Sequence, residues 1–443
     1  MGRESIVNYV KNKKELCIEK DSISEELFEK YKVNRGLRDV NGKGVLTGLT
    51  NISEVISFKD IDGVKTPVEG ELWYRGYKVN SLINDLGAHE FGFEKMAYLL
   101  LFGKKPDEKE LAEFKKVIAD NRTLPTNFTR DVIMKAPSKD IMNSMTRSIL
   151  TLASYDEDVA SVDLENSIRQ CLLLIAQFPM LAVYGYHAYN HYFNDDSMYI
   201  HRPDPSLSTA ENILMMLRHD KSYTELEAKI LDIALILHME HGGGNNSTFT
   251  TRVVTSAGTD TYSTIAAAMS SLKGPRHGGA NIKVMEMMQN IHENIHDITD
   301  REEIRAYLSK ILNKEVFDHK GLIYGLGHAV YSLSDPREVI FKDYVRKLAS
   351  SKGKDKEMNL YQMIEEEGIQ LINERRHIFK GVCANVDFYS GFVYDMLGIP
   401  QELYTPLFAI ARIVGWSSHR IEELICMNKI IRPAYMSVMK ELE

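Results

Sequence analysis

The sequence predicts a mainly α-helical protein of two lobes, with one small β element near its N-terminus. Three observations support this fold class. Apolar residues recur at helical spacing over most of the chain, and short alternating segments occur only at residues 52–77. The length of 443 residues exceeds the size at which a single hydrophobic core stops growing. A hydrophobic content of 44% then indicates a globular protein.

The first 80 residues combine a charged arm with the β element. Residues 1–45 are charged and irregular, and only residues 23–31 have the pattern of a short helix in an otherwise extended arm. Residues 52–77 hold short strand-like segments separated by turn residues such as Asp62 and Gly63. We therefore predict a small sheet or hairpin at this position.

The pattern after residue 77 is helix after helix. Residues 93–102 form an apolar helical run that ends at Gly103, and Pro106 opens the next helix with acidic residues in its first turn. Ser208 and Glu211 have the spacing of a capping box. Further helix boundaries are predicted at prolines, namely Pro137, Pro179 and the segment 203–205.

A change in composition predicts where the lobes divide. Residues 279–391 are more charged than the segments around them, which indicates a small domain. Residues 1–278 would form the first part of a large helical domain, and residues 392–443 would return to it. These boundaries fall close to glycine-rich motifs, and a cleft between lobes is a common place for a small-molecule site.

Charge and cysteine content limit the class of partner. A net charge of −8 and a pI near 6.0 give no electrostatic footprint for nucleic acid or an anionic membrane, so a small molecule is favoured. The apolar run 171–186 is short for a membrane span and contains Gln177 and Pro179. The cysteines stand singly, which argues against a zinc site or disulfides and favours a reducing, cytoplasmic location: Cys17, Cys171, Cys383 and Cys426.

The first glycine-histidine segment follows a predicted helix at residues 231–241. The glycine triplet 242–244 must end this helix, because glycine costs about 1 kcal/mol in a helix interior. His241 would then lie at the negative end of the helix dipole, where imidazolium and an anionic substrate are favoured. A histidine that only caps its own helix is an open alternative. Zinc at His238 and His241 is disfavoured, because their spacing is three residues and no third ligand is indicated.

The second segment places His277 between Pro275 and the helix-like run 281–291. At or before a helix N-terminus the imidazole should stay neutral and donate a hydrogen bond to a developing oxyanion. A loop histidine without a catalytic role is the alternative. A third cluster at residues 321–331 presents His328 on a glycine loop, and it lacks the third glycine of a dinucleotide fingerprint. A merely packed histidine is equally compatible with that loop.

Three further charged residues stand in informative settings. Asp387 has apolar and aromatic neighbours, which raise a carboxyl pKa by desolvation and suit a general base, although a helix N-cap is the simpler role. Arg337 could bind a carboxylate bidentately or form a surface ion pair. Arg412 lies in an apolar run where a charge needs a partner, and Arg432 follows 20 residues later.

Ten motifs in order, over roughly residues 45–440, resemble those of the citrate synthase family. Any one motif would be a weak signal, whereas ten in family order are specific. They include Leu-Trp-Tyr-Arg75-Gly-Tyr, His241-Gly-Gly-Gly-Asn245, Gly-Pro-Arg-His277-Gly-Gly-Ala-Asn, Gly-Leu-Gly-His328-Ala-Val-Tyr, Asp-Pro-Arg337, Asn-Val-Asp387-Phe-Tyr-Ser-Gly, Ala-Arg412 and Arg432-Pro. The arm before residue 45 and the segments 192–206 and 350–358 match less clearly.

The resemblance implies an acyltransferase that joins acetyl-CoA to oxaloacetate and hydrolyses citryl-CoA. Asp387 would remove the methyl proton, neutral His277 would hydrogen-bond the thioester carbonyl, and His328 would polarise the ketone. The implied carboxylate-binding residues are His241, Asn245, Arg337, Arg412 and Arg432. The implied CoA-binding residues are Lys273, Gly274, Lys320, Gly325 and Gly327.

The same resemblance implies a homodimer in which Arg432 reaches the neighbouring site, with no metal and no tightly bound cofactor. 2-Methylcitrate synthase, which uses propionyl-CoA, shares the catalytic residues. One methylene is worth only about 1–3 kcal/mol of discrimination, so a dual preference stays open. A catalytically silent binding protein and a histidine-ligated metalloenzyme are the remaining alternatives.

Overall fold

The structure is a computed structural model of the chain, and it describes residues 13–16, 18–39, 43–62, 64–87, 91–327, 330–376, 381–426 and 429–439. The chain divides into two compact units, Met1–Leu49 and Thr50–Glu443. The first unit contains α2 (Glu25–Lys30) and η1 (Arg35–Leu37), which confirms the predicted short helix. Residues 13–16 and 18–21 are also helical, so the arm is less extended than predicted.

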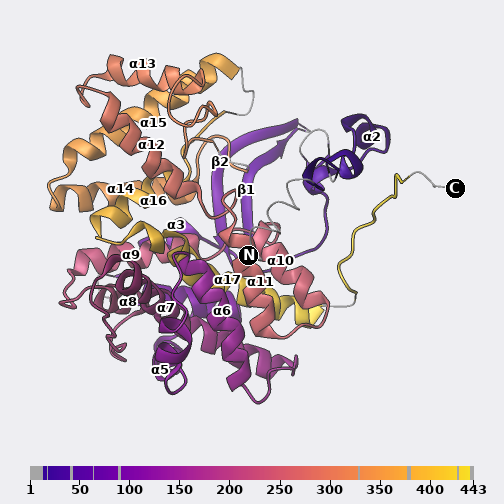
Figure 1. Cartoon of the computed structure of the whole chain (residues 1–443), viewed down its shortest axis with the longest axis vertical. Coiled ribbons are helices and arrows are strands. Elements are labelled where there is room, and N and C mark those ends of the chain that lie inside the picture. Colours follow the sequence, from indigo (N-terminus) through magenta and orange to yellow (C-terminus); the bar gives the residue numbers. More distant parts are fainter. Residues whose placement is uncertain are drawn as a thin grey trace. The chain divides into compact units, whose positions relative to one another are not determined.

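The β element of the second unit is a three-stranded antiparallel sheet of order β1-β2-β3. Its strands are β1 (Ser53–Ile61), β2 (Val64–Tyr74) and β3 (Tyr77–Lys78). The first two form a long hairpin whose register changes between Ile56 and Phe58 (Figure 1). The predicted hairpin within residues 52–77 is therefore confirmed.

Helices make up the rest of the second unit, which confirms the mainly α class. The first group is α3 (Val79–Asn84), α4 (Gly92–Phe102), α5 (Glu108–Asp120), η2 (Thr129–Met134), α6 (Ile141–Leu152), η3 (Ala153–Tyr155), α7 (Leu164–Asn194), α8 (Thr209–Leu217), α9 (Glu225–His238), α10 (Asn246–Ser256) and α11 (Thr261–Lys273). The second group is α12 (Ala280–Asn294), α13 (Arg301–Leu312), α14 (Pro336–Ser351), α15 (Asp355–Arg376) and α16 (Val386–Met396). The chain ends with η4 (Gln401–Leu403) and α17 (Tyr404–Cys426). Figure 1 shows α12–α16 gathered in its upper part and α5–α9 with α17 in its lower part.

Local sequence signals explain several helix ends. Ser208 and Glu211 form the predicted capping box at the start of α8. Gly103 ends α4 with φ +81°, a left-handed conformation that glycine adopts without strain. Asp107, one residue after the predicted start, caps α5 in a second capping box. Short-range hydrogen bonding was thus predictable from these residues.

Two sequence predictions about helix boundaries are wrong. Pro179 lies inside the 31-residue helix α7 and does not end it. Of the described helices, α7 is apolar and long enough to pass a test for a membrane span, yet 83% of its apolar window is buried in the protein, as in a core helix. Helix α9 ends at His238, three residues before the predicted end.

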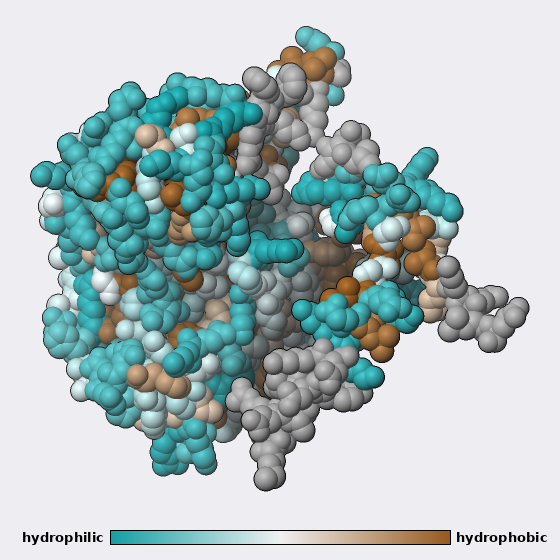
Figure 2. Space-filling model, turned by 45° about the horizontal axis from the view of Figure 1, so that its top comes forward, coloured by the Kyte–Doolittle hydropathy of each residue, from teal (hydrophilic) through white to brown (hydrophobic). Residues whose placement is uncertain are grey.

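Helix α17 lies at the centre of the packing. It packs against α7, α10, α9 and α4, and almost every residue from Tyr404 to Glu422 is buried. The buried side chains include Arg412 and Trp416, four residues apart on one helix face. The molecular face in Figure 2 is mostly hydrophilic, with apolar side chains in separate patches. The buried polar side chains of α17 must therefore find hydrogen-bond partners inside the protein.

Candidate active site

Arg412 is a buried cation with an open hydrogen-bond donor. Its side chain is 1% exposed, and its Nε donates to the His238 carbonyl oxygen at 2.7 Å. The guanidinium lies 4.7 Å from the centroid of the Phe408 ring. Burial lowers the pKa of Arg412 to about 10, so it remains charged at neutral pH. Its Nη1 has no hydrogen-bond partner within the described part of the chain, and a bound anion would supply one.

His238, the last residue of α9, and His241 have different surroundings. His238 is buried, its Nδ1 donates to the Ala234 carbonyl at 2.8 Å, and burial lowers its pKa to about 3. It is a neutral histidine that caps its own helix. His241 is half-buried, with its Nε2 3.3 Å from the Tyr331 hydroxyl. Among the residues with described positions, no group of three or more His, Cys, Asp or Glu side chains could hold a metal ion.

His277 lies in the turn between α11 and α12, against the N-terminus of α10. Its Nε2 is 3.4 Å from the Ser247 amide nitrogen and 3.0 Å from the Ser247 hydroxyl, to which Trp416 Nε1 donates at 3.1 Å. The amide can only donate, so Nε2 accepts and the ring proton is on Nδ1. Burial, with a contribution from Arg412, lowers the pKa of His277 to about 4. The neutral state agrees with the prediction, and His277 lies just before α12 as predicted, while its ring contacts the start of α10.

Asn245 precedes the first residue of α10, and its Oδ1 is 3.0 Å from the Ser247 hydroxyl. Asn245 and His277 therefore contact the same hydroxyl group, that of Ser247. His241 and His277 are more than 30 residues apart in the sequence. The turn 274–278 nevertheless brings His277 to the end of α10 that Asn245 precedes. The two glycine-histidine segments thus meet at one place.

Arg337 is held by a carboxylate of its own helix end. Its Nε and Nη2 donate to the two oxygens of Asp335 at 3.0 and 2.7 Å, and both side chains are buried. Burial lowers the pKa of Arg337, and the charge of Asp335 more than offsets this, so the pKa lies above its ordinary value. Asp335 also accepts from the Val386 amide at 3.3 Å. This carboxylate therefore joins α14 to the start of α16.

Asp387 is the second residue of α16 and is half-buried. The predicted N-cap role is wrong, because Asn385 is the N-cap and its side chain accepts from the Asp387 amide at 3.0 Å. Burial raises the pKa of Asp387 to about 6, although the charges of Arg337 and Arg412 act to lower it. This is the desolvated carboxyl that the apolar neighbours predicted.

The glycine loop before residue 328 is bonded to the start of α16. The Asn385 amide donates to the Gly325 carbonyl at 2.9 Å, and the Gly327 amide donates to the Cys383 carbonyl at 2.8 Å. Gly325 has φ +82°, and a Cβ there would lie 2.6 Å from the Phe388 ring. Only glycine allows this approach. His328 itself lies outside the described residues, so its role stays a prediction.

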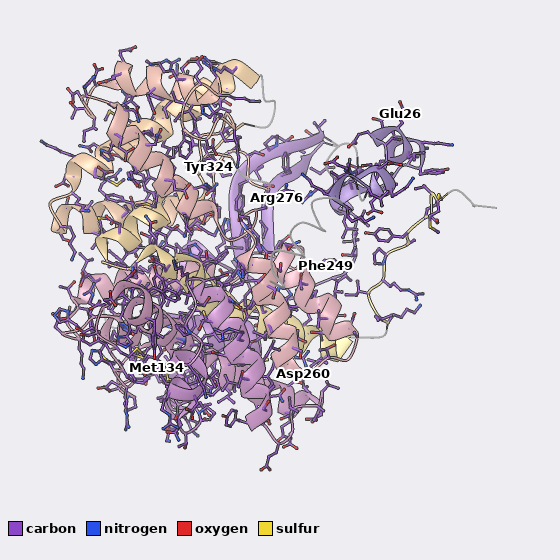
Figure 3. All side chains as sticks on the ribbon, in the orientation of Figure 1. Glu26, Met134, Phe249, Asp260, Arg276 and Tyr324 are labelled. Carbon is purple, nitrogen blue, oxygen red and sulfur yellow. The ribbon has the colours of Figure 1, made fainter. Side chains whose placement is uncertain are left out.

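The other predicted CoA and substrate residues have exposed side chains. Lys273 pairs with Asp140 at 2.5 Å beside the α11 C-cap Gly274. Lys320 Nζ lies 4.0 Å from Asp318, which accepts a hydrogen bond from Tyr324 at 2.5 Å. Figure 3 labels Tyr324 in the upper helix group and Arg276 on the loop after α11. Arg432 is exposed on the extended tail 429–439, so the buried cluster does not include it.

Several residues of the cluster were not identified from the sequence. They are Ser247, Tyr331, Asp335, Trp416, Glu240 and His419. Trp416 and His419 follow Arg412 by four and seven residues on α17, so helical spacing could have indicated them. Ser247 and Tyr331 have no such signal, because their partners are distant in sequence.

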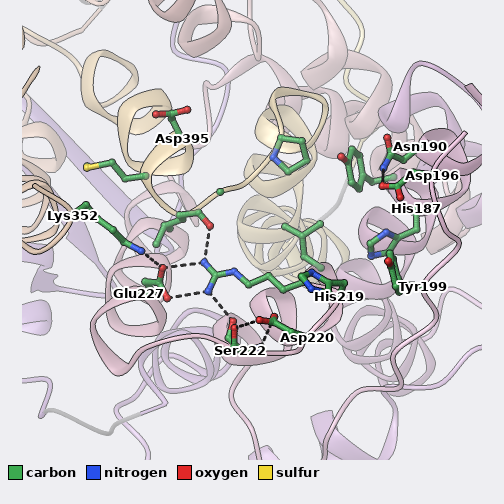
Figure 4. A pocket seen from close by; sticks show the side chains of 17 residues that line it. His187, Asn190, Asp196, Tyr199, His219, Asp220, Ser222, Glu227, Lys352 and Asp395 are labelled. Atoms are coloured by element: carbon green, nitrogen blue, oxygen red, sulfur yellow. Dashed lines mark hydrogen bonds and ion pairs between the residues drawn. The ribbon is translucent and has the colours of Figure 1, made fainter. Parts of the chain in front are cut away.

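A cavity of about 790 Å³ lies apart from this cluster. Figure 4 shows Glu227 in it, bonded to Arg218 at 2.9 Å and to Lys352 at 2.6 Å. None of the predicted site residues lines this cavity. Its size therefore does not identify the active site, which is defined by the chemistry of the buried cluster.

The fold and the cluster together define a class of protein. A buried cation with an open hydrogen-bond donor, a neutral imidazole donor and a carboxyl with a pKa near 6 suit an enzyme that moves protons on a small anionic substrate. Residues 39–434 match the family model described as citrate synthase, C-terminal domain. The chain belongs to the citrate synthase family and is a transferase.

Relatives within this family carry two names. Citrate synthase of Synechocystis sp. is 34% identical over 84% of this chain and 85% of its own length. 2-Methylcitrate synthase of Shewanella oneidensis is 33% identical over 82% and 87%, respectively. Among solved structures, the citrate synthase of Pyrobaculum aerophilum aligns with TM-score 0.75 at 28% identity over 92% of this chain and 93% of that chain.

The citrate synthase of Thermoplasma acidophilum, solved as a ternary complex with carboxymethyl coenzyme A and oxaloacetate, is also similar. It aligns with TM-score 0.75 at 28% identity over 93% of this chain and 97% of that chain. A CoA thioester and oxaloacetate are the substrates of the family. The fold, the family and the class of enzyme are therefore established together.

Proposed function

We propose that this protein is a citrate synthase that condenses acetyl-CoA with oxaloacetate and hydrolyses citryl-CoA to citrate and CoA. The observation that carries the proposal is the buried Arg412, whose open Nη1 lies in the same cluster as neutral His277 and Asp387. The names of several relatives and the ligands of the Thermoplasma acidophilum structure support it.

In the first step, the Asp387 carboxylate removes a methyl proton from the thioester. A pKa of about 6 leaves it mostly ionised at neutral pH and makes it a stronger base than an ordinary aspartate. The Nδ1–H of His277 donates to the thioester carbonyl oxygen, which gains charge as the enolate or enol forms. The electron pair of the broken C–H bond becomes the nucleophile.

In the second step, this carbon attacks the ketone carbon of oxaloacetate. The ketone oxygen takes up the displaced electron pair and is protonated, a role that we assign to His328. His241, Asn245, Arg337 and Arg412 hold the carboxylates of the dicarboxylate substrate. Water then adds to the thioester carbon of citryl-CoA, and CoA leaves as the thiol. CoA is bound by Lys273, Gly274, Lys320, Gly325 and Gly327.

We also propose that the enzyme is a homodimer in which Arg432 binds substrate in the partner subunit. The tail 429–439 is extended and carries large apolar side chains that are strongly exposed, including Tyr435 at 95% and Met439 at 86%. Apolar surface of this kind is favoured where another chain covers it. Sedimentation of a fully active monomer would refute this part.

The two-domain organisation and the cellular location belong to the same proposal. Residues 279–391 form the small domain, and residues 1–278 and 392–443 form the large domain. The carboxyl groups and histidines of the site then come from both domains, so closure of one on the other would exclude water. Cys171, Cys383 and Cys426, the cysteines that the structure describes, form no disulfide, which supports the proposed cytoplasmic location.

2-Methylcitrate synthase activity is a second candidate. The relative from Shewanella oneidensis and a second one from Corynebacterium glutamicum, 30% identical over 88% of this chain, carry that name. A preference based on one methylene is worth about 1–3 kcal/mol, or roughly 10-fold to 200-fold in rate. A dual-specificity enzyme is compatible with this range.

The deciding experiment is a comparison of kcat/KM for acetyl-CoA and propionyl-CoA, with oxaloacetate as the second substrate and thiol release as the readout. We expect the higher value for acetyl-CoA. A higher value for propionyl-CoA would favour the second candidate. If neither thioester releases CoA in the presence of oxaloacetate, both proposed activities are wrong.

A further inference from the structure

A buried carboxylate lies next to His241 and accepts three hydrogen bonds. Glu240 and His419 are both 0% exposed, and His419 Nε2 is 2.9 Å from Glu240 Oε1. The same oxygen accepts from the Ser53 hydroxyl at 2.9 Å and from the Gly242 amide at 2.6 Å. Helix α17 approaches closely because residue 415 is glycine, where a Cβ would lie 2.3 Å from Glu240 Oε2.

The protonation state of His419 follows from its other neighbour. Arg252 Nη2 is 2.7 Å from His419 Nδ1, and a guanidinium can only donate. Nδ1 must therefore accept, so the ring is neutral and its single proton lies on Nε2, directed at Glu240. Arg252 is itself held by Glu422 and by Glu423, the latter at 2.8 Å.

Glu240 is the negatively charged acceptor of this hydrogen-bond network. Burial acts to raise the pKa of Glu240, whereas the hydrogen bonds from His419 and Ser53 and the charge of Arg412 lower it below its ordinary value. Glu240 is therefore ionised at neutral pH. A buried carboxylate of this kind is stable only while its donors stay in place.

We propose that His419 is a positioning residue for His241, and that it acts through Glu240. The carboxylate of Glu240 bonds the Gly242 amide and thus closes a short loop around His241, with Gly242 at φ +85°. His419 fixes that carboxylate, and Arg252 fixes the tautomer of His419. His241 is thereby presented toward Tyr331, 3.3 Å away, where it binds the dicarboxylate. This inference rests on the proposed function.

The test compares His419→Asn with His419→Gln. The glutamine amide reaches the position of Nε2 and can still donate to Glu240, whereas the asparagine amide is too short. We expect His419→Asn to raise KM for oxaloacetate about tenfold or more, since a hydrogen bond to a charged group is lost. The kcat and the KM for acetyl-CoA should change little, and His419→Gln should restore most of the affinity.

A structural role alone would give a different result. His187→Asn is the matched control, because His187 is also buried and its Nε2 donates to the Met216 carbonyl at 3.1 Å, away from the cluster. If His419→Asn lowers thermal stability as His187→Asn does and leaves KM for oxaloacetate unchanged, the positioning role is wrong. Equal losses in His419→Asn and His419→Gln would also overturn it.

A measurement without catalysis separates this inference from the proposed function. The ¹⁵N shifts of His419, assigned by comparison with His419→Gln, should show a neutral ring protonated on Nε2. A protonated ring or the opposite tautomer overturns the network. If the wild-type enzyme releases no CoA but the tautomer is as expected, the proposed function has failed and the network has not.

Discussion

Arg412 on α17 and Arg337 on α14 are both buried in the candidate site, but their guanidinium groups have different hydrogen-bond partners. Arg337 is bonded twice to Asp335, whereas Arg412 Nη1 has no hydrogen-bond partner within the described ranges. Burial lowers the pKa of Arg412 to about 10, while Asp335 raises that of Arg337 above its ordinary value. On the α17 side, Arg412 can therefore donate a hydrogen bond to a bound anion. On the α14–α16 side, the charge of Arg337 is already neutralised by Asp335.

This difference separates binding from positioning. A buried donor without an acceptor costs stability until an anion binds, so the open Nη1 of Arg412 suits substrate recognition, with Glu240 offsetting part of the charge. Asp335 bonds both Arg337 and the Val386 amide, and the latter residue directly precedes Asp387. The ion pair of Arg337 and Asp335 thus helps to place the proposed base, in addition to the carboxylate contact proposed for Arg337. Changes on the two sides should have different consequences.

The largest effect is expected for Asp387→Asn on the α16 side. Loss of the general base should lower kcat by about 10²–10⁴-fold, because proton transfer contributes that much. Oxaloacetate affinity should stay near the wild-type value, since the arginines are untouched. Steady-state rates and titration calorimetry measure the two quantities. A variant with near-normal turnover would show that another group removes the proton.

Arg337→Ala should destabilise the protein strongly. It leaves Asp335 buried without its partner, and breaking a buried ion pair in this way costs about 3–5 kcal/mol. Arg412→Ala is the contrasting variant, because its guanidinium is attracted by the charge of Glu240 and, in the described part of the chain, donates only to the His238 carbonyl oxygen; it should weaken oxaloacetate binding and cost less stability than Arg337→Ala. Denaturant unfolding of both variants without substrate tests this. Equal destabilisation would remove the distinction between the two sides.

His277→Ala is expected to have the next largest effect, on the α17 side. Removal of one oxyanion donor costs about 2.7–4 kcal/mol of transition-state stabilisation, or roughly 10²–10³-fold in kcat. Oxaloacetate affinity should be retained, because His277 contacts Ser247 and not the arginines. Single-turnover rates at saturating oxaloacetate provide the measurement. A loss confined to KM would contradict the donor role.

The sequence predicted those parts of the fold that depend on neighbouring residues. The capping box of Ser208, the helix end at Gly103 and the hairpin within residues 52–77 all rest on short-range hydrogen bonds or alternation. Pro179 was interpreted wrongly because a helix interior can accommodate proline when packing compensates for the lost hydrogen bond. That compensation depends on tertiary contacts and has no local pattern.

The sequence predicted the individual site residues but not the contacts between them. Residue type and setting identified His277, Asp387 and Arg412, and the desolvated state of Asp387 followed from its apolar neighbours. Their partners could not be found in the same way, because Ser247 and His277 are 30 residues apart and meet only through the turn after α11. For His277 the low pKa arises mainly from burial and not from a helix dipole.

The smallest effect concerns the pH dependence on the two sides. The pKa of Asp387 is about 6, so kcat/KM should fall about tenfold per pH unit below that value as the base is protonated. His277, with a pKa of about 4, stays neutral over the same range and should not contribute. The acidic limb should be absent from the residual activity of Asp387→Asn.

Stability should change in the opposite direction. Because folding raises the pKa of Asp387, its contribution to stability is fully present below its unfolded pKa and is lost as the pH rises through about 6. Asp387→Asn lacks this loss, so its melting temperature should gain on that of the wild type between pH 5 and 7. A difference in melting temperature that stays constant across this range would show that Asp387 is not the desolvated base. A wild-type rate profile that is flat down to pH 5 would show the same, because neither Asp387 nor His277 would then titrate between pH 5 and 7.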